Sequence, residues 1–372
     1  MILMNDFKRQ WEMVGPSILS TVQEVGQKGW YILGEEVSNF ESELSHYFGL
    51  DYAVGVGNGM DAIEIALRCL GAGPQDKVLT TPLSAFATTL AIMRIGAEPV
   101  FVDVDPRGLI DLSRVDRLLS SRSDIRFLLP VHLYGFALDL DRLESIKQKY
   151  SVQVIEDCAQ SIGARFGNRL AGTVGDIAAT SFYPTKNLGA MGDGGALLTN
   201  QEGLARAARC IRNYGQSSQY VHSESGLNSR LDELQAAILR KSMLPFLNDW
   251  NLRRKAISRR YLAEIQNPNL KLPELKKDIE AVWHLFPVLV QKSDRDHFIN
   301  YLKSKGVASG IHYPHLIPTQ KALQEYKRYE VIGELEQASL IVSHEVSLPI
   351  HPFLTENEID HVIEACNSWR TH

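Results

Sequence analysis

The sequence predicts an α/β protein with a mainly parallel sheet. Short apolar and β-branched runs, which are typical of strands, recur through the first 200 residues with helical patterns between many of them. The longer runs are apolar throughout, which predicts strands covered by helices on both faces. The predicted strands lie at residues 52–56, 78–81, 100–104, 127–132, 152–157, 177–182 and 196–199.

The length of 372 residues exceeds what a single hydrophobic core usually holds, so we expect a large domain with a smaller companion. A helical pattern begins near Leu231, and Pro245 should end or kink it. We therefore place a large α/β domain at residues 1–246 and an α+β domain at residues 247–372. The predicted elements of the second domain are a strand within 282–290, a helix near 298–305, a strand near 307–312 and a last helix that begins with a capping box at 355–358.

The composition is that of an ordinary globular protein, with 44% hydrophobic and 22% charged residues. A formal charge of −5 and the lack of a basic cluster argue against nucleic-acid binding. The four cysteines lack the paired spacing of a zinc or redox motif and suit a reducing compartment. No apolar run is long enough to cross a membrane, and the first ten residues do not resemble a signal peptide. These features predict a cytoplasmic protein that binds neither nucleic acid nor membrane.

Lys186 lies in a loop between two of the predicted strands, and a glycine-rich turn at 189–195 follows it. Loops that a rigid sheet holds in place often carry functional side chains. A lysine amine can attack a carbonyl group if its surroundings lower its pKa enough to supply the neutral form. The alternative is a solvated surface lysine, as most lysines are.

Asp157 and Gln160 follow the predicted strand at 152–157. Open α/β sheets bind their ligands at the carboxyl ends of the strands. A carboxylate there can keep the ring nitrogen of pyridoxal phosphate protonated, and a nearby amide can bind the ring hydroxyl. The alternatives are a carboxylate that caps the strand end and an amide that starts a helix.

Glycines at 55, 57 and 59 precede a helical pattern and predict a phosphate site, because the backbone N–H groups at a helix start attract anions. An ordinary strand-to-helix turn is the plain alternative. An NAD-dependent dehydrogenase is disfavoured, since the glycine spacing departs from the dinucleotide fingerprint. Moreover, the acidic residue at the expected distance, Asp76, lies before the next strand rather than at its end.

The chain resembles the nucleotide-sugar aminotransferases of the DegT/DnrJ/EryC1/StrS family, which are pyridoxal phosphate enzymes of fold type I. The resemblance covers essentially the whole chain and rests on the order and spacing of several motifs. They are YILG (31–34), GNGMDA (57–62), PVHLYG (130–135), EDCAQ (156–160), the loop around Lys186 and LDELQAA (231–237).

The resemblance implies a role for each matching residue. Lys186 would hold the cofactor and move the proton at the reacting carbon, and its presence favours transamination over dehydration, for which the family has histidine here. The predicted cofactor-binding residues are Gly59, Met60, Phe86, Asp157, Gln160, Ser181 and Asn228. Phe86 would stack on the pyridine ring, and the alternative is an ordinary core phenylalanine. Asn228 would reach the phosphate of the neighbouring subunit, and the alternative is the start of a helix, which Ser229 and Asp232 also fit. Met60 departs from the threonine or serine that is common in the family, so Ser181 is the hydroxyl expected at the phosphate.

Tyr183, His312 and Tyr313 are the candidates for contact with the sugar, and a structural role is the alternative for His312 and Tyr313. Tyr183 adjoins the lysine loop. The spacing of His312 and His315 could also suggest a metal site, but Pro314 opposes a regular helix between them and no third ligand is evident. We therefore predict no metal.

The lysine loop most resembles that of enzymes that aminate C3 of a dTDP-linked 3-keto-6-deoxyhexose. The resemblance implies pyridoxal 5'-phosphate as cofactor, L-glutamate as amino donor, a dTDP-3-amino-3,6-dideoxyhexose as product and a homodimer with shared active sites. The alternatives are amination at C4, amination of a UDP-sugar at C3, and a pyridoxal phosphate-binding regulatory protein without turnover.

Overall fold

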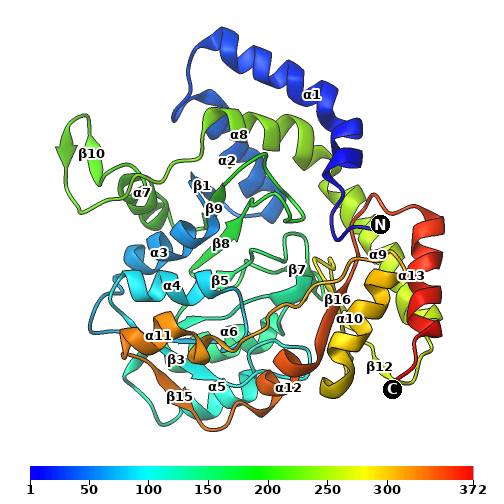
Figure 1. Cartoon of the computed structure of the whole chain (residues 1–372). Coiled ribbons are helices and arrows are strands. Elements are labelled where there is room, and N and C mark those ends of the chain that lie inside the picture. The colour runs from blue at the N-terminus through cyan, green and yellow to red at the C-terminus, as the bar shows by residue number, and fades with distance from the viewer. Residues whose placement is uncertain (372) are drawn as a thin grey trace.

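The computed structural model describes residues 1–371. An eight-stranded sheet forms its centre, with strand order β1-β9-β8-β5-β4-β2-β3-β15 (Figure 1). All seven strands predicted in the first 200 residues are confirmed, with shifts of one to three residues at some ends. Their bounds are β1 Tyr52–Val56, β2 Lys77–Thr80, β3 Glu98–Val102, β4 Ile125–Leu129, β5 Gln153–Asp157, β8 Ile177–Ser181 and β9 Gly195–Thr199.

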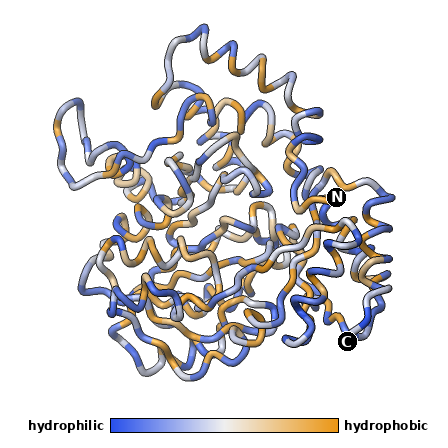
Figure 2. Tube along the Cα trace, viewed as in Figure 1, coloured by the Kyte–Doolittle hydropathy of each residue, from blue (hydrophilic) through white to orange (hydrophobic). Residues whose placement is uncertain are grey.

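The sheet is mixed but mostly parallel, as predicted. Strands β8, β5, β4, β2, β3 and β15 pair in parallel, and β9 runs antiparallel to both β8 and β1. Every residue of β8 and β9 is buried, as the apolar strand pattern requires. The helices that follow the strands are α3 Gly59–Cys69, α4 Phe86–Arg94, α5 Leu112–Leu119, α6 Leu140–Tyr150 and α7 Glu202–Ile211. Figure 2 shows many apolar residues along the central strands and many hydrophilic ones on the outer turns.

Helices α1 Phe7–Lys28 and α2 Glu35–Phe48 precede the sheet and pack against α8 Glu233–Ile238. The predicted interruption at Pro245 is confirmed. A π-helical turn, Leu239–Met243, and a 3-10 turn, Leu244–Phe246, separate α8 from α9 Leu247–Glu264. Figure 1 shows α9 on the right, running from the end of the α8 segment towards the C-terminal helices.

The C-terminal part has a three-stranded antiparallel sheet of β12 Leu270–Lys271, β14 Phe286–Val290 and β16 Glu345–Leu348. Helices α10 Arg295–Ser304, α12 Glu336–His344 and α13 Glu356–Ser368 accompany it. The predicted capping box is confirmed, since Thr355 and Glu358 bond each other's backbone N–H groups. The predicted strand near 307–312 is wrong. Val307 bridges to Ile2 and Gly310 bridges to Ser347, so the segment changes partner before a ladder can form.

The chain returns to the large sheet after residue 247. Helix α11 Lys321–Tyr326 precedes β15 Glu330–Ile332, which pairs with β3 at the sheet edge. Strand β13 Ile279–Glu280 pairs with β6 Arg165–Phe166, which also pairs with β7 Arg169–Leu170. The C-terminal part therefore contributes strands to sheets of the large domain, and the division at residue 247 stays a prediction.

A hairpin of β10 Gln216–Ser218 and β11 Val221–His222 projects from the body of the molecule (Figure 1). Within the described residues, no helix is both long enough and apolar enough to cross a membrane.

Candidate active site

The loop that carries Lys186 leaves the end of β8 and is held in place on both sides. The Lys186 N–H donates to the carbonyl of Tyr183 at 2.8 Å, and a Cβ on Gly189 would lie 2.4 Å from the Pro184 carbonyl oxygen, so the turn requires glycine there. The Asn187 amide nitrogen donates to Asn251 at 2.8 Å and to the Val282 carbonyl at 3.1 Å. The loop is thus fastened to α9 and to the segment before β14.

The Lys186 amine is positioned to react as a nucleophile. No hydrogen bond or ion pair involves it within the described part of the chain, and Lys186 is half-buried. Burial lowers the pKa of Lys186 to about 8, and the nearby Asp157 carboxylate partly opposes this shift. The neutral amine is therefore far more abundant near neutral pH than on a surface lysine.

Asp157 ends β5 and is buried beside this lysine. Its carboxylate accepts hydrogen bonds from the Thr88 hydroxyl at 2.8 Å and the Ala159 N–H at 3.0 Å. Burial raises the pKa of Asp157, and these two donors and Lys186 act against the rise. A cationic ring nitrogen placed against this carboxylate would be stabilised in a site of low polarity.

Gln160 links the end of β5 to the segment that carries His312 and Tyr313. Its side-chain oxygen accepts from the Tyr134 N–H at 2.7 Å, and its nitrogen donates to the Tyr313 hydroxyl at 3.0 Å. The Tyr134 hydroxyl in turn donates to the His312 carbonyl at 2.5 Å. Two of the three predicted sugar-contacting residues therefore lie beside the predicted cofactor residues.

The start of α3 presses against the end of β8. A Cβ on Gly59 would lie 2.6 Å from the Ser181 Cβ, so only glycine allows this approach. Asn58 caps the helix by accepting from the Asp61 N–H at 2.8 Å, and the N–H groups of Gly59 and Met60 have no partner within the helix. These N–H groups and the Ser181 hydroxyl form a cradle suited to a phosphate.

Comparison with known proteins agrees with this geometry. The family model described as the DegT/DnrJ/EryC1/StrS aminotransferase family matches residues 13–367. The chain belongs to this family. The aminotransferase is 42% identical over 353 residues to the dTDP-3-amino-3,6-dideoxy-alpha-D-galactopyranose transaminase of Aneurinibacillus thermoaerophilus, covering 95% of each chain. It is 38% identical over 366 residues to the dTDP-3-amino-3,4,6-trideoxy-alpha-D-glucose transaminase of Streptomyces venezuelae, covering 98% of this chain and 95% of the relative.

A solved structure of DesV from S. venezuelae has the same fold, with a TM-score of 0.94 at 38% identity over 99% of this chain and 98% of the other. The chain is therefore a sugar aminotransferase that depends on pyridoxal 5'-phosphate and takes a keto sugar and an amino donor. The fold class and the cofactor predicted from the sequence are confirmed.

The residues present fit three polar groups of this cofactor. The cradle at Gly59 and Ser181 suits the phosphate, the Asp157 carboxylate suits the ring nitrogen and the unpartnered Lys186 amine suits the carbonyl group. When bound, pyridoxal phosphate supplies an electron sink for the substrate carbon. The assignment of each residue to a cofactor group stays a prediction.

The structure gives less direct support for the predicted roles of Phe86 and Asn228 than for those of Asp157 and Lys186. Phe86 begins α4 and is half-buried against a small apolar cluster of Phe101, Ile317 and Leu323. It lies two residues before Thr88, whose hydroxyl bonds Asp157. Asn228 is exposed after the projecting hairpin and bridges to Asn213.

The third predicted sugar contact, Tyr183, is 53% exposed at the loop that carries Lys186. The described residues include no group of three His, Cys, Asp or Glu side chains placed to hold a metal ion.

Sequence reasoning missed several residues that hold the site together. Thr88 bonds Asp157 across 69 positions, and His284 lies 3.2 Å from the Asn187 amide oxygen across 97 positions. No local motif indicates such distant pairs. Of these residues, only Asn187 could have been found from the sequence, because it directly follows Lys186.

Proposed function

We propose that this aminotransferase converts a dTDP-linked 3-keto-6-deoxyhexose to the 3-amino-3,6-dideoxyhexose, with L-glutamate as the amino donor. The observation that carries the proposal is the unpartnered Lys186 amine of lowered pKa, with Asp157 on one side and the His312–Tyr313 segment beyond Gln160. The two relatives, whose names both specify 3-amino-6-deoxy sugars on dTDP, support the choice of C3.

In this proposal each side chain has one task. The Lys186 amine takes the proton from Cα of the amino donor, and in the other half-reaction it gives a proton to C3 of the sugar. Asp157 holds a positive charge on the ring nitrogen, and Gln160 fixes the position of the Tyr313 hydroxyl. His312, Tyr313 and the exposed Tyr183 bind the sugar.

The names of the relatives differ at C4 of the sugar. One is a galactopyranose that keeps its C4 hydroxyl, and the other is a 4-deoxy glucose. A site that hydrogen-bonds a hydroxyl discriminates strongly against a sugar that lacks it, because its own polar group is then left unpaired. We propose a substrate with a C4 hydroxyl, since the His312 ring nitrogen Nε2 has no partner within the described chain.

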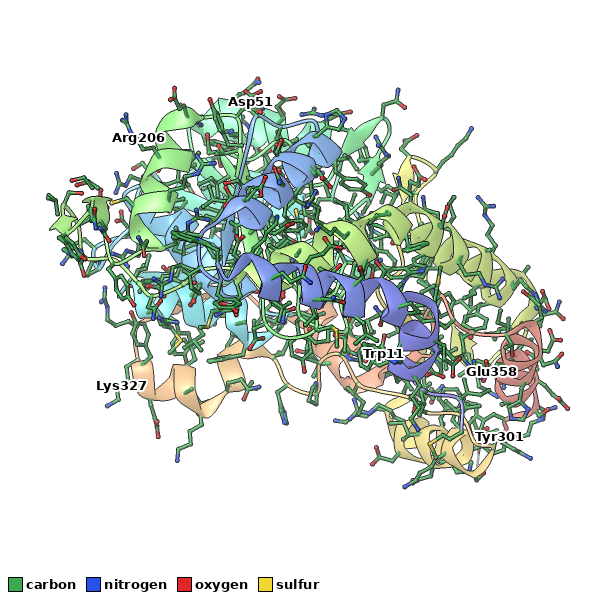
Figure 3. All side chains as sticks on the ribbon, turned by 90° about the horizontal axis from the view of Figure 1, so that it is seen from above. Trp11, Asp51, Arg206, Tyr301, Lys327 and Glu358 are labelled. Carbon is green, nitrogen blue, oxygen red and sulfur yellow. The ribbon has the colours of Figure 1, made fainter. Side chains whose placement is uncertain are left out.

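We further propose a homodimer that works in the cytoplasm. Large apolar side chains on one side of α1 are exposed, namely Phe7, Trp11, Leu19 and Val22. Figure 3 shows α1 with Trp11 along the upper face of the molecule. An apolar helix face of this kind is typical of a subunit interface. Asn228, which is exposed, would then face the site of the second subunit.

The test is amination by the purified protein with pyridoxal phosphate and L-glutamate. The substrates are dTDP-3-keto-6-deoxyhexoses of gluco and galacto configuration, the 4-deoxy analogue, a 4-keto sugar and a UDP-linked 3-keto sugar. Mass spectrometry identifies the product, and Lys186→Ala is the blank. Turnover of a dTDP-3-keto sugar with a C4 hydroxyl supports the proposal, and turnover of only the 4-keto or UDP-linked sugar overturns it. A yellow protein that glutamate does not bleach would indicate a regulatory protein.

A further inference from the structure

Three side chains form a hydrogen-bonded chain behind the candidate sugar site. Glu345 and Ser347 lie two residues apart on β16 and therefore on the same face of the strand. Paired backbone bonds between Gly310 and Ser347, of 2.8 and 3.2 Å, bring the segment with His312 alongside. One Glu345 oxygen accepts from the His312 N–H at 2.6 Å, and the other accepts from the Ser347 hydroxyl. The Nδ1 of His312 lies 2.9 Å from the same hydroxyl oxygen.

A serine hydroxyl has one proton, so it can donate to only one of its two neighbours. When Glu345 is ionised, Ser347 donates to the carboxylate and must accept from a proton on His312 Nδ1. The other nitrogen, Nε2, then has a free lone pair. When Glu345 is protonated, it donates to Ser347, the hydroxyl donates to Nδ1, and the proton of the imidazole sits on Nε2. The imidazole is neutral in both arrangements.

Both arrangements are accessible near the working pH. Glu345 is fully buried, and burial raises its pKa to about 8, against the opposing effects of the Ser347 hydroxyl, the His312 N–H and the Arg295 guanidinium. The other titratable groups that face Glu345 are the hydroxyls of Tyr134 and Tyr313. Burial and the nearby Lys186 lower the pKa of His312 to about 4, so the imidazole stays uncharged.

The Nε2 end of the imidazole is accessible. The ring packs over Gly310, where a Cβ would lie 2.9 Å from the ring carbon Cε1. Nε2 has no hydrogen-bond partner among residues 1–371, and it is not among the fully buried polar atoms that lack one. The His312 carbonyl accepts from the Tyr134 hydroxyl, and the Tyr313 hydroxyl accepts from Gln160, so this segment lies beside the predicted cofactor residues.

We propose that Glu345 and Ser347 are positioning residues that set the tautomer of His312, so that the sugar meets a hydrogen-bond acceptor at Nε2 when Glu345 is ionised and a donor when it is protonated. The contact with the sugar rests on the proposed function, whereas the coupling of the three side chains does not. The acceptor form binds the sugar better, because the neighbouring Tyr313 hydroxyl, which accepts from Gln160, already presents a donor.

The coupling is tested by 15N NMR of the holoenzyme labelled at histidine, with His312→Gln to identify the His312 signals. In the native protein, the proton should sit on Nδ1 well above the Glu345 pKa and on Nε2 well below it. Glu345→Gln should keep the proton on Nε2 at every pH, because its amide always donates to Ser347. Ser347→Ala should remove the pH dependence. A native tautomer that does not change, or one that Glu345→Gln leaves unaltered at high pH, overturns the coupling.

The role towards the sugar is tested by calorimetric titration of the holoenzyme with a dTDP-6-deoxyhexose that has hydroxyls at C3 and C4. The affinity of the native protein should rise by about three- to tenfold, the contribution of one hydrogen bond, as Glu345 ionises. Glu345→Gln and Ser347→Ala should show no such rise. If the tautomer switches but the affinity of the native protein stays constant, the sugar does not contact His312 and the role proposed for it is wrong.

Discussion

The close approach of Gly59 to Ser181 predicts the effect of a single methyl group. In Gly59→Ala, the new Cβ would lie 2.6 Å from the Ser181 Cβ and 3.2 Å from its Cα, and both belong to the buried end of β8. Neither atom can swing away as a flexible side chain would. Overpacking of this kind costs about 1–3 kcal/mol in the free energy of unfolding. The backbone displacement that relieves this clash also moves the N–H groups proposed to bind the phosphate. Loss of one charge-assisted hydrogen bond weakens cofactor binding about tenfold or more.

Gly203→Ala is the matched control. Gly203 lies in the first turn of α7, and a Cβ there would meet nothing within 4 Å. Alanine should stabilise this helix by about 0.5–1 kcal/mol without any effect on the cofactor. Denaturant unfolding measures the free energy of unfolding. Titration of the apoenzyme with pyridoxal phosphate, followed by absorbance, measures the affinity for the cofactor. Equal behaviour of the two variants in both assays would refute the cradle at Gly59.

Three further perturbations test the remainder of the site. Cofactor capture by the apoenzyme should speed up with pH, reach half of its maximum at a pH of about 8 and level off above it, because only the neutral Lys186 amine reacts. Asp157→Asn should move this midpoint to lower pH, since it removes the carboxylate that raises the Lys186 pKa. A rise that continues towards about 10.4 would contradict this. Thr88→Val should raise the pKa of Asp157 and so move the acid limb of the rate–pH profile to higher pH. Thr89→Val removes a hydroxyl that has no hydrogen-bond partner in the described chain and should leave the profile unchanged. Asn187→Ala should lower the free energy of unfolding by about 1–3 kcal/mol, because the buried side chains of Asn251 and His284 lose their partner. An unchanged denaturant midpoint of unfolding would contradict this.

The large sheet was predictable because its strands are short runs of mostly apolar and β-branched residues, such as Ile177–Ser181, between helical patterns. The sequence also indicated Lys186, Asp157 and Gln160, because each lies just after a strand or at its end, where α/β sheets bind ligands. The capping box at Thr355 was a purely local signal, and it is confirmed.

What the sequence could not predict depends on distant contacts. Strand β15 has three residues and joins the sheet only because α11 carries the chain back to β3. The segment around Val307 and Gly310 looked like a strand but is divided between two partners, Ile2 and Ser347. The bonds from His312 to Glu345 and Ser347 join residues more than 30 positions apart, which no local pattern records.

The most direct test of the account is to find the lysine that holds the cofactor. Borohydride reduction of the holoenzyme fixes pyridoxal phosphate to that residue, and peptide mass spectrometry locates it. We predict modification of Lys186 alone, and its loss when L-glutamate is added before the borohydride, because the amino donor releases the lysine. Modification of another lysine, or none in a protein that has bound the cofactor, would contradict the assignment of this site.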